Sequence, residues 1–272
     1  MIWSRFRRSK LALGALIYVV VVALIAIFAP ALTTDPNAID LASRLSPPTH
    51  AHPLGTDDLG RDILARLAHG ARVSLTVGFA ATAIALIVGS FLGAIAGYYG
   101  GVADWVVSRA IEVVLCFPFL LLVLAIVALF GPSFTTIMIA LGLTSWTSEA
   151  RYMRAEFLRI REMEFAQAAR ASGARDARII FRHLLPNALA PVLVSASFGV
   201  ASAILTESAL SFLDMGVPPP TASWGNILAV AERHIDYAWW LVVFPGVAIF
   251  LTVAAFNIIG DRVRDALDPR AE

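Results

Sequence analysis

Six long apolar runs constrain the fold of this chain more than any other feature of its sequence. A helix that crosses the hydrocarbon layer of a membrane, about 30 Å thick, needs roughly 20 predominantly apolar residues. Inside lipid the backbone must satisfy its own hydrogen bonds, and a helix does so locally. The sequence therefore predicts an all-α polytopic membrane protein with six transmembrane helices. The predicted spans are residues 11–32, 74–98, 104–130, 133–150, 188–213 and 237–260.

The composition agrees with a membrane-embedded chain. Of the 272 residues, 58% are hydrophobic and 15% are charged, whereas a soluble domain usually carries about 25% charged residues. The net charge of +1 gives no overall basic field, so we expect no nucleic-acid partner. Cys116 is the only cysteine and lies in an apolar run, which excludes a disulfide framework and a cysteine-based zinc site.

The placement of arginine predicts how the six spans are oriented. Basic residues concentrate in three segments, namely the N-terminal tail 1–10, the loop 151–186 and the C-terminal tail 261–272. Six alternating spans place these segments on one side, and positive loops mark the cytoplasmic side. Both termini are therefore predicted to be cytoplasmic, with residues 33–73 outside and residues 74–260 as the transmembrane core. The first run, 11–32, exceeds the roughly 7–15 residues of a signal-peptide core, so we expect it to be retained as a span.

The outer segment 33–73 is predicted to hold a short amphipathic helix that lies on the membrane surface. Thr56 is suited to be its N-cap, and Asp57 and Asp58 in the first turn would interact favourably with the helix dipole. The helical period places Ile63, Leu64, Leu67 and Ala71 on one face. It turns Arg61, Asp62 and Arg66 away from that face.

Glu112 and Glu207 lie inside predicted spans, where a charge is costly and often marks a function. Glu112 is one helical turn from Arg109, so it either pairs with a snorkelling arginine at the membrane boundary or lines a transport pathway. Glu207 lies deeper, has no evident partner nearby in the sequence and is expected to face the interior of the bundle, where it could also line a pathway. Two scattered glutamates do not make a proton relay.

No catalytic or metal site is predicted on this chain. The five histidines have neither the spacing nor the neighbouring ligands of a metal site, namely His50, His52, His69, His183 and His234. The sequence contains neither a phosphate-binding G-x-x-x-x-G-K-[ST] loop nor a G-x-S-x-G nucleophile elbow. Gly89, Gly93 and Gly97 follow a small-residue spacing that is typical of helix packing. We therefore expect a protein that is not an enzyme and that binds no cofactor of its own.

One polar stretch between two apolar spans, "EFAQAARASGARDARIIFRHLLPN" at residues 164–187, is unusual in such a chain. It predicts a helix that ends near Gly173 and a second helix that leads to Pro186. The first helix has a face of mainly small residues, on which another surface can approach closely, formed by Phe165, Ala168, Ala169 and Ser172. The stretch could dock a soluble partner, or it could lie on the bilayer with its arginines on lipid phosphates.

This stretch resembles the signature loop of importer-type ABC transporter permeases, which reads Glu-Ala-Ala, three residues, Gly, nine residues, Ile, one residue, Leu-Pro. The positions that match its register are Gln167, Ala168, Ala169, Gly173, Leu185 and Pro186. Two positions depart from it, because Gln167 stands in place of the Glu and His183 in place of the Ile. The glutamine keeps hydrogen-bonding capacity but removes the charge, so a salt bridge at that position is not expected here.

Three further segments resemble the dipeptide, oligopeptide and nickel branch of these permeases, and in particular its shorter, C-type subunit. They are "HPLGTDDLGRDILARLAHGARVSL", "TESALSFLDMGVPPPTASWGNIL" and the terminal "GDRVRDALDPR". The resemblance runs from the first span to the last residues, and the motifs occur in the family's order.

The resemblance implies a type I ABC importer permease fold with a cytoplasmic coupling helix. That helix would sit in a cleft on an ATP-hydrolysing subunit, and ATP and Mg would bind to that partner rather than to this chain. The residues implied in this docking are Glu164, Phe165, Gln167, Ala168, Ala169, Ser172, Gly173, Leu185 and Pro186.

The resemblance also implies a set of partners in the cytoplasmic (inner) membrane of a bacterium. They are a homologous second permease in a heterodimer, two cytoplasmic ATP-binding subunits, an extracytoplasmic substrate-binding protein and membrane lipid. Asp57, Trp224 and Asn226, in the outer segments, are implied as contacts of the binding protein. Trp224 could equally be an aromatic residue of the membrane interface.

The implied function is ATP-driven import of dipeptides or oligopeptides. Import of nickel or another small solute stays open within the same family. A secondary transporter would show matching halves with broken helices, which this sequence does not have. A membrane-bound enzyme would need a nucleophile–base arrangement, which is also missing from the sequence.

Overall fold

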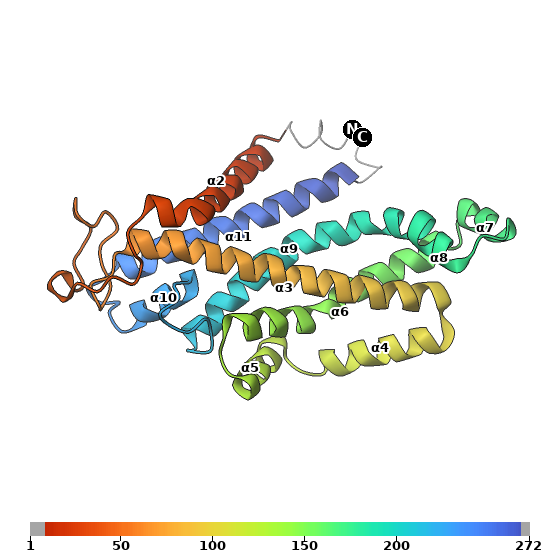
Figure 1. Cartoon of the computed structure of the whole chain (residues 1–272). Helices are drawn as coiled ribbons and strands as arrows, with labels where there is room; N and C mark the ends of the chain where they lie inside the picture. The colour runs from red at the N-terminus through yellow and green to blue at the C-terminus, as the bar shows by residue number, and fades with distance from the viewer. Residues whose placement is uncertain (1–8, 268–272) are drawn as a thin grey trace.

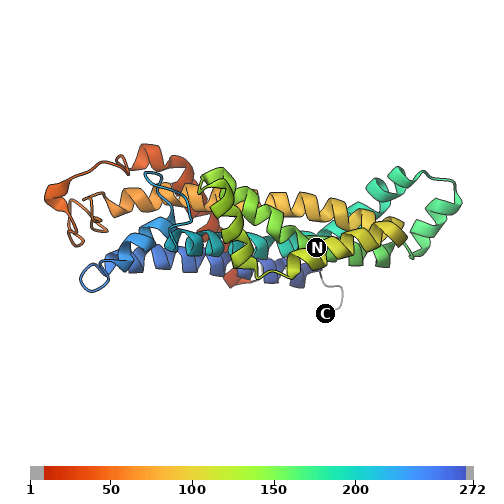
Figure 2. The ribbon, with the colours of Figure 1, turned by 90° about the horizontal axis from the view of Figure 1, so that it is seen from below.

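The structure is a computed structural model that describes residues 9–267, and helices form most of this range. The long helices run lengthwise in one elongated bundle (Figure 1), and a view turned by 90° shows the same shape (Figure 2). The prediction of an all-α membrane fold is therefore confirmed. The helices are α2 (Lys10–Leu32), η1 (Leu41–Ser43), α3 (Ile63–Tyr99), α4 (Gly101–Leu115), α5 (Phe119–Phe130), α6 (Phe134–Ile160), α7 (Glu164–Ala171), α8 (Asp176–Arg178), η2 (Ile179–Leu184), α9 (Leu185–Phe212), α10 (Trp224–Glu232) and α11 (Trp240–Leu267).

The two ends of the bundle differ in kind. Irregular segments gather at one end, which we call the loop end and which holds residues 33–62 and 213–239. The short helix α7 projects at the opposite end, which we call the α7 end (Figures 1 and 2). Helix α2 begins, and helix α11 ends, toward the α7 end (Figure 1). The predicted tail 1–10 lies almost wholly outside the described residues, and the predicted tail 261–272 continues α11 as far as Leu267.

Helix α3 is the central element, and its most extensive packing is with α6. Three glycines make this close approach possible. A Cβ atom added at Gly89 would lie 2.6 Å from the Glu149 Cβ, and one added at Gly97 would lie 2.6 Å from the Phe157 Cβ. At Gly93 it would collide with the Ala150 carbonyl oxygen. The small-residue spacing in the sequence therefore does mark a helix-packing face, as predicted.

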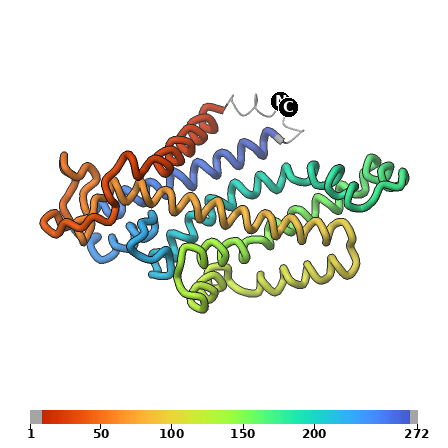
Figure 3. The backbone as a smooth tube through the Cα atoms, viewed as in Figure 1, coloured from red at the N-terminus to blue at the C-terminus, as the bar shows by residue number. Residues whose placement is uncertain are grey.

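The third predicted span, residues 104–130, is not one straight helix. Helices α4 and α5 meet at an angle of 86°, with the break at residues 116–118, and the tube in Figure 3 shows the turn. Pro118 explains the break, because proline has no N–H to donate and disfavours a helical conformation in the residue before it.

The number of spans also differs from the six predicted. Within residues 9–267, four helices are long and apolar enough to cross a membrane, or five if the bent α4–α5 pair counts as one span. The remaining predicted span corresponds to α6, which does not end near residue 150 but continues to Ile160. Its second half carries charged residues, which lower its apolar character, namely Glu149, Arg151, Arg154, Glu156 and Arg159.

The predicted surface helix before the second span does not exist as a separate element. Helix α3 begins at Ile63 and runs without interruption for 37 residues. Its N-cap is Asp62, whose side chain accepts a hydrogen bond from the Ala65 N–H at 2.9 Å. Thr56 therefore caps no helix, and the preceding segment folds as an irregular loop because its polar groups bond to one another.

Candidate functional site

The segment from the end of α6 to the first turn of α9 contains the residues that match the sequence motif. Helix α6 ends at Ile160, three residues intervene, and α7 then runs from Glu164 to Ala171. The sequence predicted one break, at Gly173, and the structure adds another at residues 161–163. After α7 the chain turns into α8 and η2, which continue directly into α9 (Figure 1).

Helix α7 ends in a Schellman motif, which explains the glycine. Gly173 has φ +76°, a backbone conformation that most residues avoid. Its N–H donates to the Arg170 carbonyl at 3.0 Å, and the Ala174 N–H donates to the Ala169 carbonyl at 3.1 Å. A Cβ atom at Gly173 would meet nothing within 4 Å. The glycine is therefore required by the backbone and not by packing.

One face of α7 is held by the protein and the other is exposed. Ala166 is buried in a cluster with residues of α6, η2 and α9 such as Phe157 and Ile179. The side chains of Phe165, Ala168 and Ser172 are exposed. The predicted face of mainly small residues therefore points away from the chain, apart from Ala169, which is half-buried.

Polar contacts join this loop to the end of α3. The Tyr98 hydroxyl donates to the Asp176 carboxylate at 2.6 Å, and the Arg170 guanidinium lies 5.7 Å from the centre of the Tyr98 ring. Arg161 donates to the carbonyl of Gly97 at 2.9 Å, and so satisfies an acceptor that the end of a helix leaves free. Displacement of α7 would therefore pull on α3 as well as on α9.

Of the two departures from the motif, Gln167 makes a side-chain contact of its own, whereas the contact at His183 is through the backbone carbonyl, which any residue would supply. The Gln167 amide donates from Nε2 to the Glu162 carbonyl at 3.1 Å, a bond that a glutamate could not make. The carbonyl of His183 accepts from the Asn187 side chain at 2.7 Å. Leu185 and Pro186 begin α9, directly after the π-helical turn of η2.

Glu112 lies on the surface of the chain. Its carboxylate accepts a hydrogen bond from Arg109 at 2.5 Å, and both side chains are largely exposed. The pair that the sequence suggested is therefore present. On the neighbouring turns, the Asp104 carboxylate pairs with Arg154 of α6, with 2.7 Å between Arg154 Nη2 and Asp104 Oδ2, and so links α4 to α6.

Glu207 is fully buried and has partners, which corrects the expectation that it lacks one. The Ser211 hydroxyl donates to its carboxylate at 2.8 Å, and the Ser74 hydroxyl of α3 does so at 3.4 Å. Ser74 in turn accepts the backbone N–H of Trp224 at 3.2 Å. Glu207 therefore links α3, α9 and α10 within the protein, and in this structure it is not exposed to a pathway.

Sequence reasoning missed a second buried carboxylate, Glu149. It is 6% exposed, and its carboxylate accepts a hydrogen bond from the Ser195 hydroxyl of α9 at 2.5 Å. The sequence turns polar at the end of the predicted span 133–150, so Glu149 did not stand out as an intramembrane charge. The available signal was its place inside that span, because a carboxylate there is costly and usually faces the interior.

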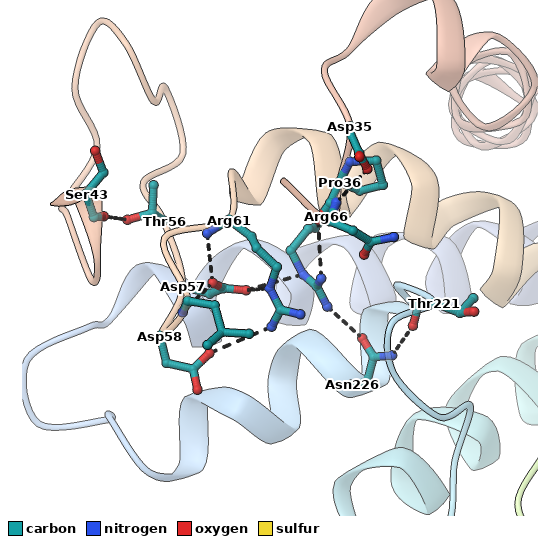
Figure 4. A network of polar contacts seen from close by, with 12 residues as sticks. Asp35, Pro36, Ser43, Thr56, Asp57, Asp58, Arg61, Arg66, Thr221 and Asn226 are labelled. Atoms are coloured by element: carbon teal, nitrogen blue, oxygen red, sulfur yellow. Dashed lines mark hydrogen bonds and ion pairs between the residues drawn. The ribbon is translucent and has the colours of Figure 1, made fainter. Parts of the chain in front are cut away.

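The loop end is organised around a buried ionic network (Figure 4). The Asp57 carboxylate accepts from Arg61 Nε at 2.7 Å and lies 3.5 Å from Arg66 Nε. Asp57 also accepts the backbone N–H groups of Leu59 and Arg61, each at 2.9 Å. Arg61 and Arg66 were expected to turn toward solvent, but both are buried, because the carboxylate of Asp57 compensates their charge.

Other polar residues close the loop around this network. The Thr56 hydroxyl donates to the Ser43 carbonyl (Figure 4) and accepts the Ser46 N–H at 2.9 Å. The Trp240 indole donates to the Thr56 carbonyl at 3.0 Å. At the exposed edge, the Ser43 hydroxyl and then the Ala42 N–H donate to Asp40 and lower the pKa of that carboxyl.

Two of the three residues implied as binding-protein contacts are not accessible. Asp57 is 1% exposed and Trp224 is 2% exposed, so neither can meet a partner in this conformation or serve as an interfacial aromatic. The Trp224 indole donates instead to the Leu67 carbonyl of α3 at 3.0 Å. The Asn226 side chain forms a capping box with Ser223 at the start of α10 and accepts from Arg66 at 3.5 Å.

Beside this network lies a cavity of about 310 Å³ between the loop of residues 57–61, the turn after α9 and α10. Charges of both signs line it, among them Asp58, Asp214 and Arg233. Among residues 9–267, no group of three or more His, Cys, Asp or Glu side chains is placed to hold a metal ion. His52 pairs with Asp62 at 2.9 Å and so joins the loop to the N-cap of α3.

Two family models match most of the chain. Residues 89–272 match the family described as "Binding-protein-dependent transport system inner membrane component". Residues 1–48 match the "N-terminal TM domain of oligopeptide transport permease C".

Named relatives are similar over nearly the whole length. The dipeptide transport system permease protein DppC of Alkalihalophilus pseudofirmus is 46% identical over 98% of this chain and 88% of its own length. The di/tripeptide transport system permease protein DppC of Pseudomonas aeruginosa is 41% identical over 98% of this chain and 91% of its own. The oligopeptide transport system permease protein OppC of Bacillus subtilis is 39% identical over 98% and 88%, respectively.

Solved structures show the same fold. A chain of the inward-facing MetNI methionine ABC transporter superposes with a TM-score of 0.59 at 20% identity, over 75% of this chain and 97% of the other. A chain of an amino acid ABC transporter crystallised with histidines gives a TM-score of 0.53 at 20% identity, over 69% and 87%. The fold, the motif loop and the relatives agree, and this chain belongs to the family of binding-protein-dependent transport system inner membrane components, the permeases of ABC importers.

Proposed function

We propose that this chain is the permease subunit of an ATP-driven importer of dipeptides or oligopeptides. The observation that carries the proposal is the exposed face of α7, presented at one end of the bundle on a helix with a defined stop at Gly173. The names of the relatives support peptides as the substrate class. Nickel or another small solute is the alternative.

The α7 end is the cytoplasmic end in this proposal, and the loop end faces outward. The exposed arginines of the motif loop support this orientation, because positive segments remain in the cytoplasm. Helix α2 begins, and helix α11 ends, toward the α7 end (Figure 1). The two termini are therefore cytoplasmic as well in this proposal. Helix α7 projects beyond the neighbouring helices, which favours a docked soluble partner over a loop that lies on the bilayer.

The proposal includes four partners beside this chain. Two cytoplasmic subunits bind ATP and Mg and hydrolyse ATP, whereas this chain performs no catalysis. A homologous second permease completes the pathway, with Glu112 of α4 on the exposed surface where such a chain could pack. A substrate-binding protein delivers the peptide at the loop end, and Asn226, which is half-buried, is the one implied contact residue there that remains partly accessible.

The contacts of α7 suggest how ATP binding moves the spans. Closure of the two ATPases would displace α7, and the continuous helical segment 176–212 would carry that movement into the membrane. The Tyr98–Asp176 hydrogen bond would carry it to α3 at the same time. Helix α7 and the segment 176–212 would then form an element with two positions, and binding of ATP to the partner would favour one of them.

A charge on the docking face tests the proposal. Ala168→Arg buries an unpaired guanidinium in the expected interface, which costs at least about 2 kcal/mol, or roughly a 30-fold loss of docking. We expect peptide uptake and transport-coupled ATP hydrolysis to be lost while the protein still inserts and folds. Ala177→Arg, at an exposed alanine beyond Gly173, is the matched control and should keep uptake. Normal uptake by Ala168→Arg would contradict docking through α7.

Affinity purification of the tagged chain from its own membrane tests the partners directly. Mass spectrometry should identify a second permease, ATP-binding subunits and a binding protein. That binding protein can then be titrated with peptides and with nickel. Recovery of the chain alone, with transport in liposomes in the absence of ATP, would contradict the importer.

A further inference from the structure

A groove lies between α2 and α3, and the ribbon shows α2 leaving α3 at an angle (Figure 1). Its volume is about 590 Å³. The lining residues are Ala23, Ala26 and Ile27 of α2 and Arg72, Leu75, Thr76, Phe79, Ala80 and Ala83 of α3. On α3 these residues form a single stripe, because they recur every three or four positions. The stripe begins with a charged residue and becomes apolar toward the middle of the bundle.

Arg72 supplies the charge at the start of the stripe. Its side chain is exposed, and it forms no ion pair with any residue of the described range 9–267. The Thr76 hydroxyl donates to the Arg72 carbonyl at 2.6 Å, a backbone contact that does not involve the guanidinium. A lone arginine on the surface of a membrane span normally has an anionic partner.

The position of Arg72 along α3 places it at the edge of the hydrocarbon layer. Helix α3 has 37 residues, so it is about 55 Å long and exceeds the hydrocarbon thickness by about 25 Å. Arg72 lies about 14 Å from the start of the helix, which is near the boundary on the loop end if the excess is shared between the two ends. From Arg72 to Ala83 the stripe continues about 16 Å into the hydrocarbon. A stripe of this length can contact most of one acyl chain.

We propose that this groove binds a phospholipid, with its phosphodiester on Arg72 and one acyl chain against Leu75, Phe79 and Ala83. Phosphate is the anion present at this depth on every bilayer surface, and arginine binds it through two parallel N–H groups. A helix of the second permease is the competing occupant, but it would have to place a carboxylate at this depth to match Arg72, at a cost of its own. The bound lipid fills the space between α2 and the core and so holds α2 in place.

The test compares lipid retention by variants of the full-length chain. The chain is purified in mild detergent with the subunits that accompany it, and native mass spectrometry counts the phospholipids that stay bound. The unchanged chain should retain one phospholipid. Arg72→Gln should lower its occupancy about five- to tenfold, as expected for the loss of one charge-assisted contact. Ala83→Phe fills the apolar part and should lower occupancy although the arginine remains. Arg44→Gln, at an exposed arginine of the loop end outside the groove, is the matched control and should change nothing.

Further measurements distinguish a lipid phosphate from free phosphate and control for misfolding of the variants. Arg72→Lys keeps a positive charge and should retain most of the occupancy, which a general loss of folding would not allow. Added phosphatidylglycerol or phosphatidylethanolamine should restore the bound lipid after delipidation, whereas millimolar inorganic phosphate should not displace it. Displacement by phosphate alone, or equal retention by the Arg72→Gln, Ala83→Phe and unchanged chains, would overturn the proposal. A photo-crosslinking amino acid at position 83 should label lipid, and labelling of the second permease instead would also overturn it.

Discussion

The two ends of this bundle use arginine in opposite ways. At the loop end Arg61 and Arg66 are buried around Asp57, which is itself 1% exposed. At the α7 end Arg170, Arg175 and Arg178 are exposed. The difference shows that the number of charges in a loop of a membrane protein does not tell whether the loop is a rigid part of the fold or a surface for a partner.

The backbone at each end explains the difference. The loop end contains long irregular segments, whose N–H and C=O groups find few partners of their own kind. Asp57 supplies acceptors for two of those N–H groups, and the two arginines hold it in place. At the α7 end a short helix satisfies its own backbone and closes with a Schellman motif. Its side chains are therefore free to face outward.

Removal of Asp57 should have the largest effect and should affect only the loop end. Asp57→Ala leaves Arg61 and Arg66 buried without a counter-charge, and the loss of one member of a buried ionic cluster costs about 3–5 kcal/mol. We expect a correspondingly lower free energy of unfolding, measured by denaturant or thermal unfolding in detergent. Asp57→Asn should be intermediate, because the amide still offers one acceptor oxygen.

Two acidic neighbours serve as controls for this comparison. Asp58 is partly exposed and lies 3.7 Å from Arg61, and Asp40 is exposed, so alanine at either position should destabilise the protein far less than Asp57→Ala. If Asp40→Ala destabilised the protein as much as Asp57→Ala, burial of the network would not be the reason for its importance.

The sequence predicted the α7 end better than the loop end, and the reason is the range of the interactions. The turn at Gly173 depends on residues within five positions of each other, so the local pattern contains it. The network at the loop end joins Asp57 to Arg66 and Arg66 to Asn226, which is 160 positions away. Local periodicity assigned Arg61 and Arg66 to solvent because it treats each charge alone.

The same argument applies to the carboxylates inside the bundle. Glu207 was expected to face the interior, but its contact with Ser74 joins residues 133 positions apart and could not be read locally. Glu149 was missed because Ser195 lies 46 positions away. The bend at Pro118 was available from the sequence, since proline seldom continues a helix, but the long apolar run around it concealed the signal.

A substitution at Gly173 should have a moderate effect and should affect only the α7 end. Gly173→Ala keeps enough space but forces φ +76° on a residue with a Cβ, which costs about 1 kcal/mol. We expect faster amide hydrogen exchange in residues 164–175, a weaker coupling of ATP hydrolysis to uptake and little change in global unfolding.

A glycine within a helix provides the matched control for this strain. Gly246→Ala lies in α11, where a Cβ would meet nothing within 4 Å, so it should be neutral or slightly stabilising. Equal effects of the two substitutions on exchange in residues 164–175 would mean that the positive φ at Gly173 does not define the end of α7.

The smallest effect is expected at Gln167, and it separates charge from geometry at the α7 end. Gln167→Glu loses the hydrogen bond from Nε2 to the Glu162 carbonyl, which is worth about 0.5 kcal/mol at an exposed site. A carboxylate near the start of α7 gains a similar amount from the helix dipole, so the two terms nearly cancel. We expect stability and uptake to stay within error of the unchanged chain, whereas Gln167→Ala loses the hydrogen bond without that gain and should weaken α7 slightly. Loss of ATPase coupling in Gln167→Glu alone would show that the partner cleft requires the neutral amide. In that case the α7 end would, like the loop end, depend on how a particular charge is matched.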